Sequence, residues 1–168
     1  TKRDWHGVAV DSNGDVYACV YNSGNIYKST DGGAFVAIEE TGRNWVSIAV
    51  DPNNGDVYAV CEYSDIYKST DGGDTWDALG LTEREWRAVG VDSNSNVYAL
   101  VHDGSIYKST DGGDNFTDLE QTSRLWNGIV VHPSGDIYAC VGGNGYIYRS
   151  TGGGDFTAVG INFKYWTG

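Results

Sequence analysis

Larger hydrophobic residues alternate with small residues along short segments of this chain. Residues 45–50 are one example, in which the side chains of Ile48 and Val50 fall on one face of an extended segment. The small side chains of Ser47 and Ala49 fall on the other face. A period of two residues predicts a β-strand. Because neither face is charged, we expect this strand to lie in a sheet that is packed on both sides.

Turns rich in Gly, Asp and Asn separate the strand-like segments. Between residues 45 and 79 the sequence predicts four strands, at 45–50, 56–61, 66–69 and 75–79. Residues 51–55 and 70–74 have the composition of turns. No window has the hydrophobic periodicity of a helix. The expected fold class is therefore all-β.

The same pattern returns about every forty residues. Trp recurs at positions 5, 45, 86, 126 and 166, and Ile-Tyr-Lys/Arg-Ser-Thr begins at positions 26, 66, 106 and 147. We therefore predict one domain over 1–168 with four repeats, at about 5–44, 45–85, 86–125 and 126–165. Four-stranded units with this period are typical of the blades of a β-propeller. A propeller of four four-stranded blades is the expected architecture.

The first and last residues stand at nearly the same phase of the repeat, which leaves three ways to complete the ring. The chain can close alone with four blades, which we expect. Two chains can form an eight-bladed ring, of which each chain is half. The chain can also belong to a longer chain or polymer, with residues 166–168 starting a contact with the next copy. Unclosed ends expose sheet surface and edges, which favours assembly.

The turn between the third and fourth strands carries a motif. Residues 69–76 read STDGGDTW and residues 109–116 read STDGGDNF. Residues 29–35 and 150–156 hold shorter versions, and the last has Gly152 in place of Asp. These turns resemble the Asp-box, S-x-D-x-G-x-T-W, of sialidase-like β-propellers. The resemblance covers all four repeats.

A propeller is also what the resemblance implies, with its Asp-boxes lying away from the functional face. An Asp in a turn accepts hydrogen bonds from nearby backbone N–H groups. We therefore predict a structural role for Asp31, Asp71 and Asp111. Because Gly152 lacks that carboxylate, we expect a softer turn in the last repeat.

Composition and charge exclude several classes of partner. The formal net charge is -12, so the surface repels phosphate backbones and no nucleic-acid partner is expected. No segment has the roughly 20 apolar residues of a membrane-spanning helix. Cys19, Cys61 and Cys140 have no metal-site or disulfide spacing and are predicted to be buried free thiols. The three His residues and the Asp/Asn turns also lack metal-ligand patterns, so we expect no metal and no cofactor.

The sequence gives little support for catalysis. The sialidases that the Asp-boxes resemble use an Arg triad, a Tyr nucleophile with a Glu, and an acidic residue, all from different blades and not repeated. Here the Arg residues repeat, each two positions before a Trp, at Arg3, Arg43, Arg84 and Arg124. We therefore expect no enzyme, and glycoside hydrolysis is the least favoured alternative.

The second-to-third-strand loops and the connections between repeats share one face of a propeller and hold the variable residues. Trp faces stack on sugar rings and Arg donates to hydroxyls or carboxylates. The predicted ligand-binding residues are Arg43, Trp45, Arg84, Trp86, Arg124, Trp126, Tyr63 and His102. In the alternative interpretation, each Trp wedges between repeats as a core residue and each Arg covers it by stacking.

These observations predict a non-catalytic binding or assembly module, and the Asp-box resemblance implies that it acts outside the cell or on a virion. Its expected partners are glycans or other copies of itself. The alternative is a structural subunit of a fibre or appendage.

Overall fold

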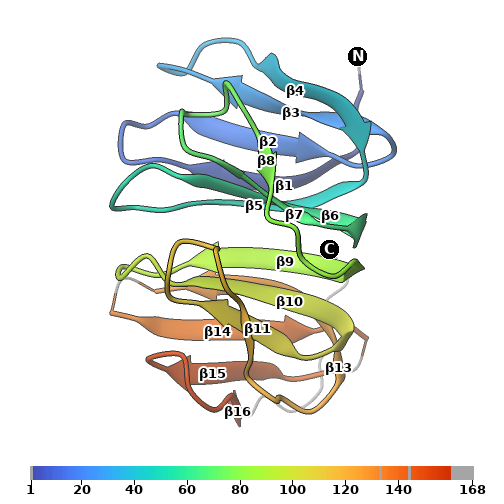
Figure 1. Cartoon of the computed structure of the whole chain (residues 1–168), viewed down its shortest axis with the longest axis vertical. Helices are drawn as coiled ribbons and strands as arrows, with labels where there is room; N and C mark the ends of the chain where they lie inside the picture. The colour runs from blue at the N-terminus through green and yellow to red at the C-terminus, as the bar shows by residue number, and fades with distance from the viewer. Residues whose placement is uncertain (1, 133, 144, 160–168) are drawn as a thin grey trace.

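The computed structural model describes residues 2–132, 134–143 and 145–159. Within these residues the chain forms sixteen β-strands and no helix, which confirms the predicted all-β class. Consecutive strands pair antiparallel in groups of four, and we call each group a blade. Figure 1 shows the blades stacked in chain order, with the first at one end and the last at the other.

The strand bounds follow the repeat. Blade 1 contains β1 (Trp5–Val10), β2 (Val16–Val20), β3 (Gly24–Ser29) and β4 (Val36–Arg43). Blade 2 contains β5 (Trp45–Val50), β6 (Val57–Ser64), β7 (Ile66–Ser69) and β8 (Asp77–Ala78). Blade 3 contains β9 (Arg84–Val91), β10 (Val97–Gly104), β11 (Ile106–Ser109) and β12 (Thr117–Asp118). Blade 4 contains β13 (Arg124–Val131), β14 (Asp136–Val141), β15 (Ile147–Thr151) and β16 (Thr157–Val159).

Several strands run further than the sequence predicted because they also pair between blades. The end of β6 pairs with the start of β9 at Glu62↔Glu85, and the end of β10 pairs with the start of β13 at His102↔Leu125. The last three blades therefore share one hydrogen-bonded sheet of twelve strands. The predicted contact of residues 166–168 with a next copy lies outside the described residues.

The turns after the first strand of each blade are held by their own side chains. The Asp51 carboxylate accepts the backbone N–H of Asn53 at 2.9 Å. The Asp92 carboxylate accepts those of Asn94 and Asn96, at 2.8 and 2.9 Å. These are plain Asx turns, and no cluster of His, Cys, Asp or Glu that could hold a metal occurs among the described residues.

Each blade has two distinct faces. We call the face that carries the Trp side chain the Trp face, and the opposite face, with the Tyr of the second strand, the Tyr face. Each of the three hydrophobic clusters joins the Tyr face of one blade to the Trp face of the next. Between blades 2 and 3, for example, Tyr58 and Val60 pack against Trp86 and Val89.

Small residues on the Tyr face allow the close approach between blades. A Cβ atom on Gly7 would lie 3.0 Å from the Cα of Ser47 in blade 2. A Cβ atom on Gly90 would lie 3.3 Å from the side chain of Ile129 in blade 4. The bulky Trp face therefore fits a slim Tyr face, which matches the alternation of larger and small residues in the first strands.

The four blades do not close into a ring in the described part of the chain. Neighbouring first strands contact in the order β1, β5, β9 and β13, which leaves one open face at each end of the series. On the Trp face of blade 1, Val8 is 70% exposed, whereas its counterpart Ile48 is 5% exposed. The ring closed by one chain that we expected from the sequence is therefore not formed, because the first and last blades stand at opposite ends of the stack.

Candidate functional site

Three of the predicted ligand-binding residues are core residues in this structure. Trp45, Trp86 and Trp126 are at most 1% exposed. The edge of each indole meets a Tyr ring of its own blade, with 5.2 Å between the ring centroids of Trp45 and Tyr67. A buried indole has no face left for a sugar ring, and its position matches the wedge interpretation.

The predicted Arg residues cover these aromatic pairs. The Arg43 guanidinium lies 4.4 Å from the ring centroid of Tyr67 and 5.4 Å from that of Trp45. Arg84 and Arg124 occupy the same position in the next two blades. Cation–π stacking of this kind stabilises the ring and the cation together. Ligand binding by these half-buried Arg residues stays a prediction.

The structure brings the other two predicted residues to one carboxylate. The Nδ1 atom of His102 lies 3.0 Å from a carboxylate oxygen of Glu85. A hydrogen bond to the same carboxylate raises the pKa of the Tyr63 phenol. Tyr63 and His102 come from different blades, and Glu85 joins them.

The Asp-boxes differ in their local bonding. The Asp71 carboxylate accepts the backbone N–H and the hydroxyl of Thr75, at 2.9 and 2.6 Å, and these bonds lower its pKa to about 2. Asp111 is held in the same way by Asn115, and its pKa is also lowered to about 2. In blade 1 the Ser29 hydroxyl donates to the carbonyl of Gly33. The structural role predicted for Asp31 stays a prediction.

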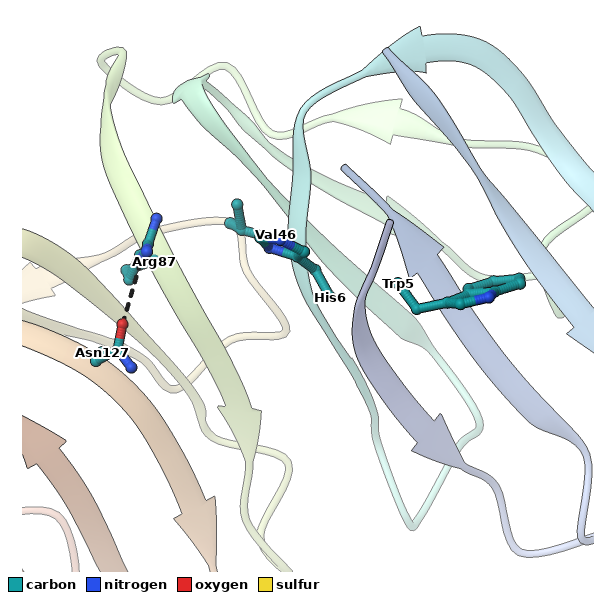
Figure 2. Close-up of a pocket in the computed structure, with 5 residues that line it drawn as sticks. All are labelled: Trp5, His6, Val46, Arg87 and Asn127. Carbon is teal, nitrogen blue, oxygen red and sulfur yellow. Dashed lines mark hydrogen bonds between the residues drawn. The ribbon is translucent and has the colours of Figure 1, made fainter. Parts of the chain in front are cut away.

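A pocket of about 270 Å³ lies where the first strands of all four blades begin, lined by Trp5, His6, Val46, Arg87 and Asn127. Figure 2 shows Arg87 beside Asn127 and His6 beside Val46, whereas the Trp5 indole points away from these four. His6, Val46, Arg87 and Asn127 are repeat equivalents, because each follows the Trp of its repeat.

A polar network reaches from blade 1 to blade 4 around this pocket. Arg87 donates to the Glu62 carboxylate at 3.1 Å and to the side-chain oxygen of Asn127 at 3.3 Å. The Tyr21 hydroxyl donates to the same Glu62 carboxylate. The imidazole of His6 stacks on the Tyr21 ring, with the centroids 4.7 Å apart.

Hydrogen bonding and burial raise the pKa of three potential nucleophiles. The hydrogen bond to Glu62 raises the pKa of the Tyr21 phenol. Burial raises the pKa of the Cys19 thiol to about 12 and also raises that of Cys61. The three Cys are free thiols, but Cys140 is only half-buried because it lies on the open Tyr face of blade 4. The predicted burial was therefore wrong for Cys140.

The sequence analysis did not identify this pocket, because its predicted site consisted mostly of residues that are the same in each repeat. The signal was present in the residue after each Trp, which differs in every repeat although the Trp before it is constant. The sequence shows which residues follow each Trp. That they meet at one pocket follows only from the arrangement of the first strands.

Comparison with solved structures supports the β-propeller fold. The chain is similar to a chain in the nidogen/laminin complex, with 19% identity, a TM-score of 0.79, and coverage of 89% of this chain and 61% of that one. It is also similar to the GH74 enzyme of Niastella koreensis, with 25% identity, a TM-score of 0.79, and coverage of 92% and 30%. For YCF48 bound to D1 peptide, the identity is 17%, the TM-score 0.72, and the coverage 94% and 55%.

No protein-family profile and no curated protein matches the chain. The chain spans between 30% and 61% of the length of these three structures. Within the described residues, no helix is long and apolar enough to cross a membrane. By fold, the chain is similar to part of a β-propeller.

Proposed function

We propose that this chain is a non-catalytic binding module and that its ligand site is the pocket formed by His6, Val46, Arg87 and Asn127. One observation carries this proposal: the residue after each Trp differs in every blade, and these four residues line one pocket. The Trp before it is constant and serves packing. A position that differs in every blade and faces a shared pocket is instead suited to recognition of one asymmetric ligand.

Carbohydrate is the ligand class that this pocket fits best. Arg87 and Asn127 offer N–H donors, and Glu62 offers acceptor oxygens, within one hydrogen-bonded network. Sugar hydroxyls both donate and accept, so they can bond to either kind of group. The net charge of -12 disfavours strongly anionic ligands. An extracellular or virion-associated location accords with this function and with the Asp-box resemblance.

Around the pocket, no nucleophile among the described residues is activated, which supports the non-catalytic part of the proposal. The Tyr21 phenol donates to Glu62, and this hydrogen bond raises its pKa, which opposes formation of a phenolate nucleophile. Glu62 also pairs with Arg87 at 3.1 Å, so its carboxylate is already engaged by two partners.

Assembly is the second function, because the blades leave two open faces. The chain would then supply four blades to a larger ring, completed by a second chain or by further repeats. Three of the similar structures are longer than this chain, which accords with a ring of more than four blades. Structural use in a fibre or appendage would employ the same faces.

Glycan-array screening of the purified chain, followed by titration calorimetry of each hit, tests the binding proposal. Arg87→Ala and Asn127→Ala should each weaken binding about tenfold, or ~1.4 kcal/mol. Asn13→Ala, in an exposed turn away from the pocket, is the matched control. Absence of any glycan hit, or affinities unchanged by both pocket substitutions, would contradict the proposal. Cleavage of a bound glycan, seen by mass spectrometry, would contradict its non-catalytic part.

A further inference from the structure

We propose that the two open faces are the halves of one interface, and that a second copy of this chain docks head to tail through them. The Trp face of blade 1 in one copy would pack on the Tyr face of blade 4 in the other. This inference rests on the assembly part of the proposed function, and it does not depend on the glycan pocket.

The open Trp face of blade 1 has the composition of its buried counterparts. Trp5, Val8 and Val10 are 45%, 70% and 63% exposed. The equivalent side chains of blades 2 to 4 pack in the three hydrophobic clusters against the preceding blade. A face of this kind exposes apolar surface that water solvates poorly.

The open Tyr face of blade 4 is the other half, although Val130 stands where blades 1 to 3 carry the smaller Ala9, Ala49 and Gly90. Val130 is 63% exposed and Ile147 is 37% exposed, whereas Ile106, the counterpart of Ile147 in blade 3, is fully buried by blade 4. Cys140 is half-buried, although its counterpart Cys19 in blade 1 is fully buried by blade 2. What covers such a face elsewhere in the chain is always the Trp face of a following blade.

A polar contact inside the chain shows where the second copy would add hydrogen bonds. Tyr58 and Lys68, on the Tyr face of blade 2, donate to the carbonyl of Gly112 in the Asp-box of blade 3, at 2.9 and 3.0 Å. In the same way, Tyr17 and Lys28 of blade 1 donate to the carbonyl of Gly72 in the Asp-box of blade 2, both at 3.3 Å. We call this pair of bonds to one glycine carbonyl the Asp-box latch.

Blade 4 holds the donors of a latch that has no acceptor among the described residues. Tyr138 and Arg149 occupy the positions of Tyr58 and Lys68. Arg149 pairs with Asp136 at 2.8 Å, as Lys68 pairs with Asp56 at 2.8 Å. The donor side of the latch is therefore already arranged.

Blade 1 holds the acceptor. Gly32 corresponds to Gly72 and has a similar backbone conformation, with φ of 69° against 74°. A Cβ atom on Gly72 would lie 3.4 Å from the Lys28 amine, but one on Gly32 would have nothing within 4 Å. Docking of a second copy would place its Tyr138 and Arg149 at the Gly32 carbonyl.

Two copies that meet through both pairs of open faces would have two such interfaces and would form a closed eight-bladed ring. Each interface is heterologous, since it joins two different faces. Closure leaves no apolar blade face open, which distinguishes the pair from a filament.

Light scattering coupled to size-exclusion chromatography tests this inference without any ligand. We expect a particle with twice the 18.2 kDa mass of one chain. Val8→Asp and Val130→Asp should each yield monomers, with circular dichroism spectra like that of the unchanged chain. Val36→Asp is the control, because Val36 is 65% exposed on the outer strand β4 and lies on neither open face.

Mixing the two monomeric variants gives the sharper result. Each carries one intact face, so a Val8→Asp chain can dock through its Val130 onto the Val8 of a Val130→Asp chain. We expect the mixture to recover particles of two copies that neither variant forms alone. A monomer at every concentration, an open-ended polymer, or a mixture that stays monomeric would overturn the inference. Loss of glycan binding by the pocket variants would leave this result unchanged.

Discussion

Lys68 in blade 2 donates a hydrogen bond to the carbonyl of Gly112 in blade 3, with 3.0 Å between the two atoms. The two residues are 44 positions apart, and the bond ties one blade to the Asp-box of the next. The Asp-box, predicted here as a purely local turn, is therefore also the acceptor for a contact between blades.

Removing this cation should destabilise the chain. Lys68→Ala deletes a charge-assisted hydrogen bond and the ion pair with Asp56 at 2.8 Å. We expect the free energy of unfolding to fall by about 1–2 kcal/mol. Urea denaturation followed by Trp fluorescence measures this change.

Blade 3 supplies the control for that substitution. There the Tyr98 hydroxyl donates to Asp92 at 3.1 Å, and Asn96 stands at the position that Asp56 occupies in blade 2. Lys108→Ala should therefore cost less than half as much as Lys68→Ala. Equal losses for the two variants would argue against the Asp-box latch as the cause.

Two equivalent Trp residues should respond very differently to truncation. Trp86 is buried between blades 2 and 3, so Trp86→Ala should lower the free energy of unfolding by about 3–5 kcal/mol. Trp5 is 45% exposed on the open face, so Trp5→Ala should cost the single chain much less. Denaturation at concentrations at which the chain is monomeric compares the two losses in free energy of unfolding. Similar losses would contradict the assignment of Trp5 to an open face.

The Asp-boxes predict how stability depends on acidity. Hydrogen bonds from Thr75 and Ser69 lower the pKa of Asp71 to about 2, below its ordinary value of 3.8. A lowered folded-state pKa contributes stability that is fully present above about pH 4 and is lost as the pH falls through 2. The melting temperature should therefore drop over this range.

Asp71→Asn should remove part of that dependence on pH. The amide retains an acceptor oxygen but does not titrate, so the variant should be less stable at pH 6 and should lose less on acidification. Asp31→Asn is the matched control, since the Ser29 hydroxyl bonds to the Gly33 carbonyl instead. Parallel melting curves for Asp71→Asn and the unchanged chain from pH 6 to pH 2 would refute this assignment.

The sequence predicts the strands and their repetition because both depend on local alternation and on period. Burial of Trp45, Trp86 and Trp126 was one of two open interpretations, since a Trp beside an Arg is equally typical of a sugar site and of a covered core. Closure could not be predicted, because it depends on the angle between blades. That angle follows from the combined volumes at each interface, such as Gly90 against Ile129.

The pocket could not be predicted from the sequence, for a related reason. Its polar network joins Tyr21, Glu62, Arg87 and Asn127, which lie in four different blades. Each of these residues alone looks like an exposed polar residue near a strand end. Only their convergence at one end of the first strands identifies them as a site.

The last prediction concerns the latch donors of blade 4, Tyr138 and Arg149. If Tyr138 and Arg149 of one copy donate to the Gly32 carbonyl of the other, Tyr138→Phe and Arg149→Ala should each raise the dissociation constant of the two-copy particle. The loss of one intermolecular hydrogen bond, about 1–1.5 kcal/mol, corresponds to roughly tenfold. Analytical ultracentrifugation over a dilution series measures the constant. Lys28→Ala breaks an internal latch to Gly72 instead, so it should lower the stability of each chain and leave the dissociation constant unchanged. A constant that shifts equally in all three variants would mean that the two copies meet without this contact.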